Sequence, residues 1–245
     1  MARFYVPQPR IESGMLKVEG DEVKHIRKVL RLREGDGITV FDGLGKEFEG
    51  TIIEEGLSSV VIRVENVCSS KGDSPVEVTL AQSLLKGVKM DYLVQKATEL
   101  GVQVIVPFLS SRSVPLLDKL GRMKRHHRWE RIAIEASKQC GRVVVPKIES
   151  LQDYYGMLQR SSAATLRLIL WEREGKRLKE VLQTSKEGRR VFFVVGPEGG
   201  FSDGEVEKAR GAGFIPVTLG GRILRAETAS LCFLSILQYE QGDIG

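Results

Sequence analysis

The stretch from 194 to 202 reads VVGPEGGFS, and a second stretch from 219 to 230 reads LGGRILRAETAS. Each follows a short apolar run, at 191–195 and at 216–219, that is typical of a buried strand. The closely spaced glycines allow the backbone to turn sharply and to approach a ligand closely. In open α/β sheets, ligands bind beside loops that leave the carboxyl ends of strands. We therefore interpret each glycine loop as a place where the backbone approaches a ligand, with an ordinary strand-to-helix turn as the alternative.

Strands and helices alternate along the chain from residue 76 onward. Short apolar runs predict strands, and apolar residues at helical spacing predict helices. We expect strands at 76–81, 104–109, 165–171, 191–195 and 216–219, and helices at 89–100, around Trp129, at 202–212 and at 227–239. This alternation is typical of an α/β fold whose parallel sheet is covered by helices on both faces.

The first seventy residues differ from the rest because they are rich in expected strands. Glycine turns separate the runs, which favours a small barrel or sandwich. The expected strands lie at 38–41, 48–54 and 59–67. The polar stretch SSKGDSP at 69–75 is the expected linker. We therefore divide the chain into two domains, residues 1–70 and residues 74–245.

One helix interrupts the first group of strands, at about 21–31. Its apolar residues Val23, Ile26, Val29 and Leu30 recur at helical spacing. We therefore expect these four side chains to share one face of the helix.

The last expected helix, 227–239, is apolar nearly all round. It contains Ala229, Leu231, Cys232, Phe233, Leu234, Ile236 and Leu237. Such a helix has to be buried on several sides, and a second copy of the chain would cover one of them. Since symmetric dimers are the commonest oligomers, we expect a homodimer.

Composition excludes several classes of protein. The cysteines Cys68, Cys140 and Cys232 are far apart and form no CxxC pair, so neither a zinc site nor any other metal is expected. The N-terminus has no apolar signal core, and no later stretch is long enough to span a bilayer. We therefore expect a cytoplasmic protein without a membrane partner.

Basic residues gather in two segments. Lys24, Arg27, Lys28, Arg31 and Arg33 lie in and just after the first expected helix, and the run RMKRHHR occupies 122–128. The net charge is +5 and the pI is about 9.1. Either segment alone is typical of a solvated surface, but together they favour a footprint for a phosphate backbone.

The first glycine loop carries an acidic residue. Its spacing is neither GxGxxG nor that of a P-loop, so phosphate binding is disfavoured. Glu198 beside the glycines also argues against an anionic ligand, whereas a ligand with a positive centre, such as a sulfonium, would tolerate it.

The second glycine loop ends in two charges. Arg225 and Glu227 precede the apolar final helix, where they either form a salt bridge and cap the helix or serve catalysis and binding. No Ser-His-Asp set, paired carboxylates or metal-ligand spacing appears in the sequence, so hydrolases and metal enzymes are poorly supported.

These motifs resemble a known family. GPEGGFS at 196–202 followed by LGGRILRAETA at 219–229 is similar to the C-terminal signature of ribosomal RNA small-subunit methyltransferase E, in the SPOUT class. HIRKVLRLREGD at 25–36 and FDGLGKEFEG at 41–50 resemble its PUA-like RNA-binding domain. Two departures are visible, because Ala226 stands where the family usually has Thr and Lys138 where it often has Glu.

The resemblance implies a fold and a reaction. The expected fold is a SPOUT-type α/β domain with a deep trefoil knot and a parallel sheet, preceded by a small PUA-like β-barrel. The expected enzyme is a homodimer that uses S-adenosylmethionine to produce 3-methyluridine in the 16S ribosomal RNA of the small ribosomal subunit. The alternatives are a non-enzymatic RNA-binding assembly factor and a methyltransferase for another RNA site.

The resemblance also implies site residues. Cofactor binding is expected at Leu170, Glu172, Gly196, Pro197, Glu198, Gly199, Gly200, Leu219, Gly220, Ile223, Leu224, Arg225, Thr228 and Ala229, with backbone groups holding the adenine. RNA binding is expected at Arg27, Lys28, Arg31, Lys86, Arg112 and Arg142. The catalytic candidates are Arg225, which would stabilise the uridine anion, and Glu227, which would orient Arg225 or take the proton.

Overall fold

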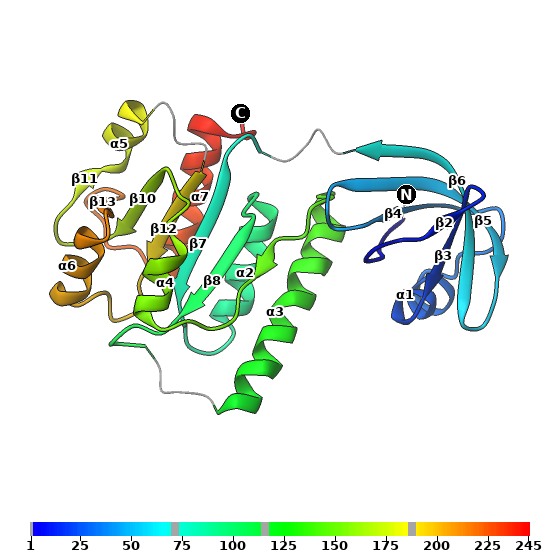
Figure 1. Cartoon of the computed structure of the whole chain (residues 1–245), viewed down its shortest axis with the longest axis horizontal. Helices are drawn as coiled ribbons and strands as arrows, with labels where there is room; N and C mark the ends of the chain where they lie inside the picture. Colours follow the sequence, from blue (N-terminus) through cyan, green and yellow to red (C-terminus); the bar gives the residue numbers. More distant parts are fainter. Residues whose placement is uncertain (1, 70–73, 114–117, 186–189) are drawn as a thin grey trace. The chain divides into compact units, whose positions relative to one another are not determined.

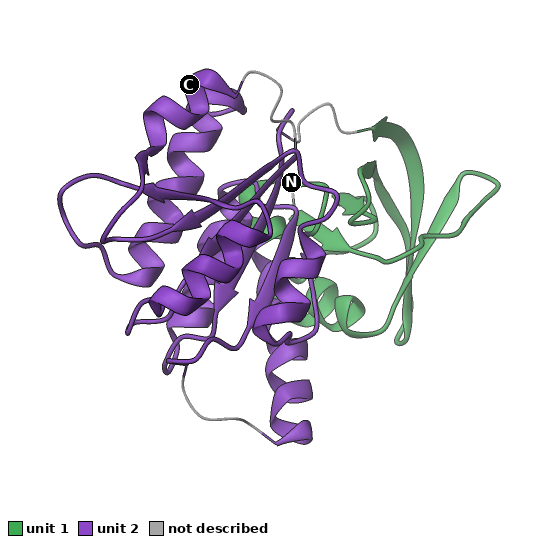
Figure 2. Cartoon of the chain, turned by 60° about the vertical axis from the view of Figure 1, so that its left-hand side comes forward, with its two compact units in different colours: residues 1–73, 137–145 green, residues 74–136, 146–245 purple. Residues whose placement is uncertain are grey.

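The computed structural model describes residues 2–69, 74–113, 118–185 and 190–245. The chain divides into two compact units, drawn in green and purple in Figure 2. Residues 1–73 and 137–145 make up the first unit, and residues 74–136 and 146–245 make up the second. Most of the expected linker, residues 70–73, lies outside the described residues.

The second unit is built on a seven-stranded sheet in the order β11-β13-β10-β12-β7-β8-β9 (Figure 1). All its strand pairs among the described residues are parallel. The strands are β7 (Glu77–Ser83), β8 (Val104–Phe108), β9 (Lys147–Ile148), β10 (Leu166–Leu170), β11 (Lys176–Arg177), β12 (Arg190–Val195) and β13 (Ile215–Thr218). The helices are α2 (Lys89–Glu99), α3 (Lys119–Cys140), α4 (Tyr154–Arg160), α5 (Leu178–Thr184), α6 (Asp203–Gly211) and α7 (Ala226–Gln241). The predicted parallel α/β fold is confirmed.

Helices cover both faces of this sheet because successive side chains of a buried strand point to opposite faces. On one face, Phe192 and Val194 of β12 belong to a core that also contains Met157 of α4 and Val206 of α6. On the other face, Phe193 stacks on Phe233 of α7 with ring centroids 4.0 Å apart. Both apolar surfaces of β12 are therefore buried, and the strand is held rigidly behind the loop that follows it.

The strand order brings the two glycine loops together. Both β12 and β13 pair in parallel with β10, which lies between them. The loops after β12 and β13 therefore leave the same edge of the sheet, on either side of the end of β10. The trefoil knot implied by the resemblance remains a prediction.

The first unit contains a six-stranded sheet in the order β1-β4-β5-β6-β3-β2, in which, among the described residues, only the β1–β4 pair is parallel. The strands are β1 (Ala2–Tyr5), β2 (Ile11–Glu12), β3 (Met15–Glu19), β4 (Gly37–Phe41), β5 (Lys46–Glu55) and β6 (Ser59–Ser69). Two register shifts between β5 and β6 bend the sheet around a core of fully or nearly fully buried side chains that includes Phe4, Leu16, Ile26, Ile38 and Ile62. The β-rich N-terminal part is confirmed.

The prediction that Val23, Ile26, Val29 and Leu30 share one apolar face of a helix at 21–31 is wrong. The α-helix α1 covers only Asp21–Lys24, and a π-helical turn, η1, follows at His25–Val29. Leu30 donates its backbone N–H to His25 O at 3.0 Å, five residues back. This wider turn changes the side-chain directions, so Val29 and Leu30 are 66% and 43% exposed while Val23 and Ile26 are buried.

The end of α3 belongs to the first unit. Lys138 forms an ion pair with Glu22 of α1 at 2.8 Å, and its side chain is only 8% exposed. Val144 makes bridges to Gly43 and Leu44, and Val145 donates its N–H to Gly43 O at 3.0 Å. The lysine that departs from the family pattern therefore neutralises a carboxylate of the N-terminal part.

Candidate ligand-binding site

A pocket of about 550 Å³ opens at the carboxyl edge of the sheet in the second unit. Its volume falls in the range of small-molecule and cofactor sites. Both glycine loops line it, together with the end of β10 and one residue of α2. The lining residues are Lys89, 170–172, 195–201, 217–226 and Ala229.

The glycines of both loops are required where the backbone turns. Gly200 has a φ of +67° and Gly220 a φ of +119°, a region that side chains rarely adopt. A Cβ at Gly200 would also lie 3.0 Å from Glu172 Oε1. A Cβ at Gly220 would meet nothing within 4 Å, so only its backbone conformation demands glycine.

A buried glutamine fixes the start of the first loop. Gln82 at the end of β7 is fully buried, and its Nε2 donates to Gly196 O at 3.2 Å. Its Oε1 accepts a hydrogen bond from Ser230 Oγ of α7 at 2.6 Å. One side chain thereby connects the first loop to the final helix. The sequence analysis missed this residue, and its only signal is a glutamine at the end of an otherwise apolar run.

Arg112 holds the same loop from another direction. Its Nη1 donates to Gly199 O at 2.9 Å. Arg112 is exposed and comes from the loop after β8. Part of its hydrogen-bonding capacity therefore serves the glycine loop, although the sequence analysis expected an RNA contact.

A capping box formed by Ser202 and Glu205 begins α6. The Ser202 side chain accepts from Glu205 N, and the Glu205 carboxylate accepts from Ser202 N at 2.9 Å. Glu205 Oε1 accepts from Ser111 N, and Oε2 accepts from both serine hydroxyls. Burial acts to raise the pKa of Glu205, but these hydrogen bonds outweigh burial and hold the pKa below its usual value.

Glu198 points to the start of α2. Its Oε1 lies 3.1 Å from Lys89 Nζ and accepts the backbone N–H of Lys86 at 3.1 Å. Burial acts to raise the pKa of Glu198, but backbone N–H groups and the Lys89 ammonium together lower it. Lys86, an expected RNA contact, is exposed. The hydrogen bond that the structure gives for it is the one from its backbone N–H to Glu198. Lys89 was not singled out in the sequence.

The structure separates the two catalytic candidates. Arg225 is exposed at the N-cap position of α7 and lines the pocket, and among the described residues its guanidinium has no ion pair. Glu227 is not part of the lining, and its Oε1 lies 3.8 Å from Lys89 Nζ. Glu227 Oε2 is buried and has no hydrogen-bond partner among the described residues. The salt bridge between Arg225 and Glu227 that the sequence left open is therefore not formed.

Most of the other residues expected to bind the cofactor line the pocket. Leu170, Glu172, Pro197, Leu219, Ile223, Leu224 and Ala229 all line the pocket. Thr228 does not line it and is exposed on α7. Trp171, at the end of β10, also lines the pocket, and its buried indole Nε1 has no partner among the described residues.

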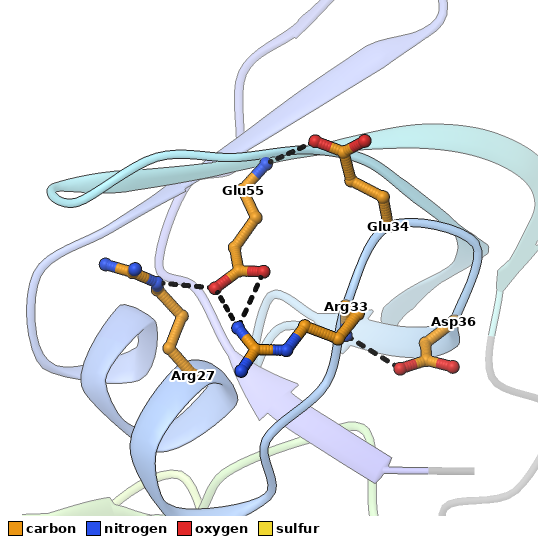
Figure 3. Close-up of polar contacts among 5 residues, drawn as sticks. All are labelled: Arg27, Arg33, Glu34, Asp36 and Glu55. Atoms are coloured by element: carbon orange, nitrogen blue, oxygen red, sulfur yellow. Dashed lines mark hydrogen bonds and ion pairs between the residues drawn. The ribbon is translucent and has the colours of Figure 1, made fainter.

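The expected RNA-binding residues of the first unit are not equivalent. Arg27 and Arg33 both bind the Glu55 carboxylate, with Oε1 2.8 Å from Arg27 Nε and 2.8 Å from Arg33 Nη1 (Figure 3). These hydrogen bonds outweigh the opposing effect of desolvation and lower the pKa of Glu55. Lys28 and Arg31 are exposed on η1 and just after it.

The last expected RNA contact is Arg142. It is partly buried in the first unit, and its backbone carbonyl accepts a hydrogen bond from Arg3.

Two structural findings limit the chemistry. Across residues 2–69, 74–113, 118–185 and 190–245, no group of three His, Cys, Asp or Glu side chains is arranged to hold a metal ion. In the same part of the chain, no helix is both long and apolar enough to cross a membrane.

The pocket fits S-adenosylmethionine, the cofactor that the resemblance implies. Backbone groups of the two loops are accessible because glycines line them, which suits an adenine recognised through main-chain atoms. Glu172 lines the same space and forms no ion pair among the described residues, so its carboxylate favours a ligand with a positive centre, whereas Glu198 is paired with Lys89.

Two family models match the chain. The model described as an RNA methyltransferase domain matches residues 72–238. The model described as an RNA methyltransferase PUA domain matches residues 18–65. Together they match the α/β part and most of the N-terminal β-rich part.

Similar proteins match nearly the whole chain. The ribosomal RNA small subunit methyltransferase E of Bacillus subtilis (strain 168) is 32% identical and covers 98% of this chain and 97% of its own. The protein of the same name from Buchnera aphidicola subsp. Acyrthosiphon pisum is 30% identical, with coverage of 98% and 94%. A crystal structure of the Neisseria gonorrhoeae ribosomal RNA small subunit methyltransferase E bound to S-adenosyl methionine is 34% identical, covers 100% of both chains and has a TM-score of 0.91.

Proposed function

The chain belongs to the RNA methyltransferase family, and we propose that it methylates N3 of a specific uridine in 16S ribosomal RNA of the small ribosomal subunit, in the cytoplasm, with S-adenosylmethionine as donor. One observation carries this proposal. The two glycine loops of the family signature meet at one edge of the sheet and enclose a pocket of about 550 Å³. Solved relatives of similar sequence carry this donor, which supports the assignment.

The donor supplies a methyl group from its sulfonium centre. Backbone groups of Leu170, Gly196, Leu219 and 223–224 would hold the adenine, since all of them line the pocket. The carboxylate of Glu172 lines the same pocket and would favour the positive charge, while Glu198 is paired with Lys89. The chain's task is to hold the donor in line with the nucleophile, because correct orientation supplies much of the rate of such a transfer.

Uridine N3 has to lose its proton before it becomes a good nucleophile. Its pKa lies about two units above neutrality, so deprotonation costs about 3 kcal/mol. Arg225 lines the pocket and has no ion pair among the described residues, which leaves its charge available to stabilise the uridine anion. Glu227 Oε2 has no hydrogen-bond partner among the described residues, so Glu227 remains a candidate proton acceptor.

The RNA substrate would be held by cations of both units. Lys28 and Arg31 are exposed near the π-helical turn, and the exposed Lys86 comes from the segment before α2. Arg27, Arg112 and Arg142 remain proposed RNA contacts. Arg27 would have to bind phosphate while its Nε donates to the Glu55 carboxylate. Arg112 would have to bind RNA while its Nη1 donates to Gly199 O.

The enzyme would act as a homodimer. Leu231, Cys232 and Ile236 of α7 are only partly buried within one chain, and Tyr239 is 69% exposed. A second copy packing on this face would cover an apolar surface next to the pocket, because α7 begins at the second glycine loop. Sedimentation velocity checks this: a single species at the mass of one 27.3 kDa chain would contradict it.

Calorimetric titration with S-adenosylmethionine tests the proposed function. The donor is expected to bind, and Arg225→Ala is expected to abolish turnover while leaving RNA affinity nearly unchanged. Absence of donor binding at millimolar concentration would favour the RNA-binding assembly factor. Loss of RNA binding in Arg225→Ala would refute the catalytic role of this residue.

A further inference from the structure

A single lysine stands between the two carboxylates that accompany the glycine loops. Lys89 is the first residue of α2 and lines the pocket. Its Nζ lies 3.1 Å from Glu198 Oε1, in the loop after β12, and 3.8 Å from Glu227 Oε1, in the first turn of α7. The lysine thus joins three segments of the second unit that are far apart in sequence.

These contacts are partly shielded from solvent. The side chains of Lys89, Glu198 and Glu227 are 34%, 26% and 14% exposed. Since one carboxylate oxygen of each glutamate lies close to the same nitrogen, removal of the ammonium would leave two negative groups near each other. In a partly buried site this repulsion is screened less than on an open surface.

The remaining contacts show why this lysine acts through its partners. Glu198 is also anchored by the backbone N–H of Lys86, so it is held against the start of α2 from two sides. Glu227 has no second partner, because its Oε2 makes no hydrogen bond with the described residues. Among the contacts that the structure gives for Glu227, the attraction to Lys89 is therefore the one that orients its side chain.

We propose that Lys89 is a positioning residue that ties the first glycine loop to the start of α7, so that both loops are held in the arrangement that binds the methyl donor. The ammonium neutralises the repulsion between Glu198 and Glu227 and sets the direction of Glu227. This inference rests on the proposed function, because the donor is the ligand whose binding it affects.

The first test needs no ligand. Hydrogen exchange is measured on the full chain for wild type, Lys89→Met, Lys89→Arg and the control Lys96→Met. Lys96 lies on the same helix and is paired with Glu99 at 2.8 Å, outside the pocket lining. Lys89→Met is expected to speed exchange about tenfold at 198–200 and 227–229, and Lys89→Arg to restore most of the protection. Unchanged exchange at both segments would overturn the proposal, whether or not the chain proves to be a methyltransferase.

The second test uses S-adenosylmethionine as the probe. Lys89→Met is expected to raise the donor dissociation constant and KM about tenfold, equivalent to about 1.4 kcal/mol. In the Glu198→Gln/Glu227→Gln background, the same substitution is expected to have an effect below about twofold, because the repulsion is already gone. An equal tenfold loss in both backgrounds would show that Lys89 contacts the donor itself and would overturn the positioning role. A wild type that fails to bind the donor would refute the proposed function instead.

Discussion

Replacement of Glu205 by glutamine tests how the loop behind the pocket is held. Glu205 is 6% exposed, and its two carboxylate oxygens face two different backbone donors, Ser111 N and Ser202 N, at 2.8 and 2.9 Å. Whichever way a glutamine amide turns, its NH₂ group meets one of these N–H groups. One buried donor is then left without an acceptor.

The expected cost follows from that geometry. An unpartnered buried N–H costs about 1–3 kcal/mol, and charge-assisted hydrogen bonds to the serine hydroxyls weaken as well. We expect Glu205→Gln to destabilise the second unit by about 2–3 kcal/mol at pH 7. With a urea m-value of about 2–3 kcal/mol/M, the unfolding midpoint would fall by about 1 M. Trp129 and Trp171, the only tryptophans, both belong to this unit, so tryptophan fluorescence reports its unfolding.

The pH dependence of this cost has a definite sign. The pKa of Glu205 is lowered in the folded chain, so its contribution to stability is fully present above the ordinary value of 4.5. That contribution is lost as the pH falls through the lowered pKa. The gap between wild type and Glu205→Gln should therefore be constant from pH 6 to 8 and shrink below about pH 4.5.

A matched control is Glu207→Gln on the same helix. Its side chain is 70% exposed and paired with Arg210, so a change below about 1 kcal/mol is expected. A Glu205→Gln midpoint equal to that of the control, or a gap that persists undiminished at pH 3, would refute this reasoning.

Three further outcomes are expected. Gly200→Ala places a side chain at a φ of +67° and against Glu172. Calorimetry should therefore show donor affinity reduced at least tenfold, equivalent to about 1.4 kcal/mol. The control Gly204→Ala on α6, where a Cβ meets nothing within 4 Å, should bind the donor normally. Lys138→Met removes the ammonium partner of the largely buried Glu22 carboxylate and should lower protection of α1 in hydrogen exchange by about 2 kcal/mol; protection equal to wild type would contradict this. The double change Lys28→Glu/Arg31→Glu should weaken RNA binding and reduce the slope of log affinity against log salt concentration by about 2. The control Lys17→Glu on β3 should leave this slope nearly unchanged. Equal slopes for both variants would exclude the η1 region as an RNA contact.

The sheet of the second unit was predictable because its strands are buried on both faces. Their apolar runs are continuous, as at 191–195, and glycines or polar turns bound them. Short elements such as β9, β11 and α5 were not predicted, because the apolar residues in two to seven positions show no measurable periodicity. Nor was the π-helical turn at His25–Val29 foreseeable, since the spacing of its apolar residues suits an ordinary helix equally well.

The candidate site was predictable where backbone conformation decides it. Gly200 and Gly220 indicate sharp turns, and the apolar runs before them predict that both turns lie at the ends of strands. The contacts of Gln82, Lys89 and Arg112 with the first glycine loop were not predictable, because they depend on which strands are neighbours. The strand order β10-β12-β7-β8 brings their segments beside the first glycine loop, and no local pattern encodes that order.

Small ribosomal subunits that lack the modification, incubated with the purified chain and donor labelled in the methyl group, measure the central claim most directly. After digestion of the 16S ribosomal RNA, the label should appear in 3-methyluridine, at a single position. Label in another nucleoside, or none above the level of Arg225→Ala, would contradict the proposed reaction.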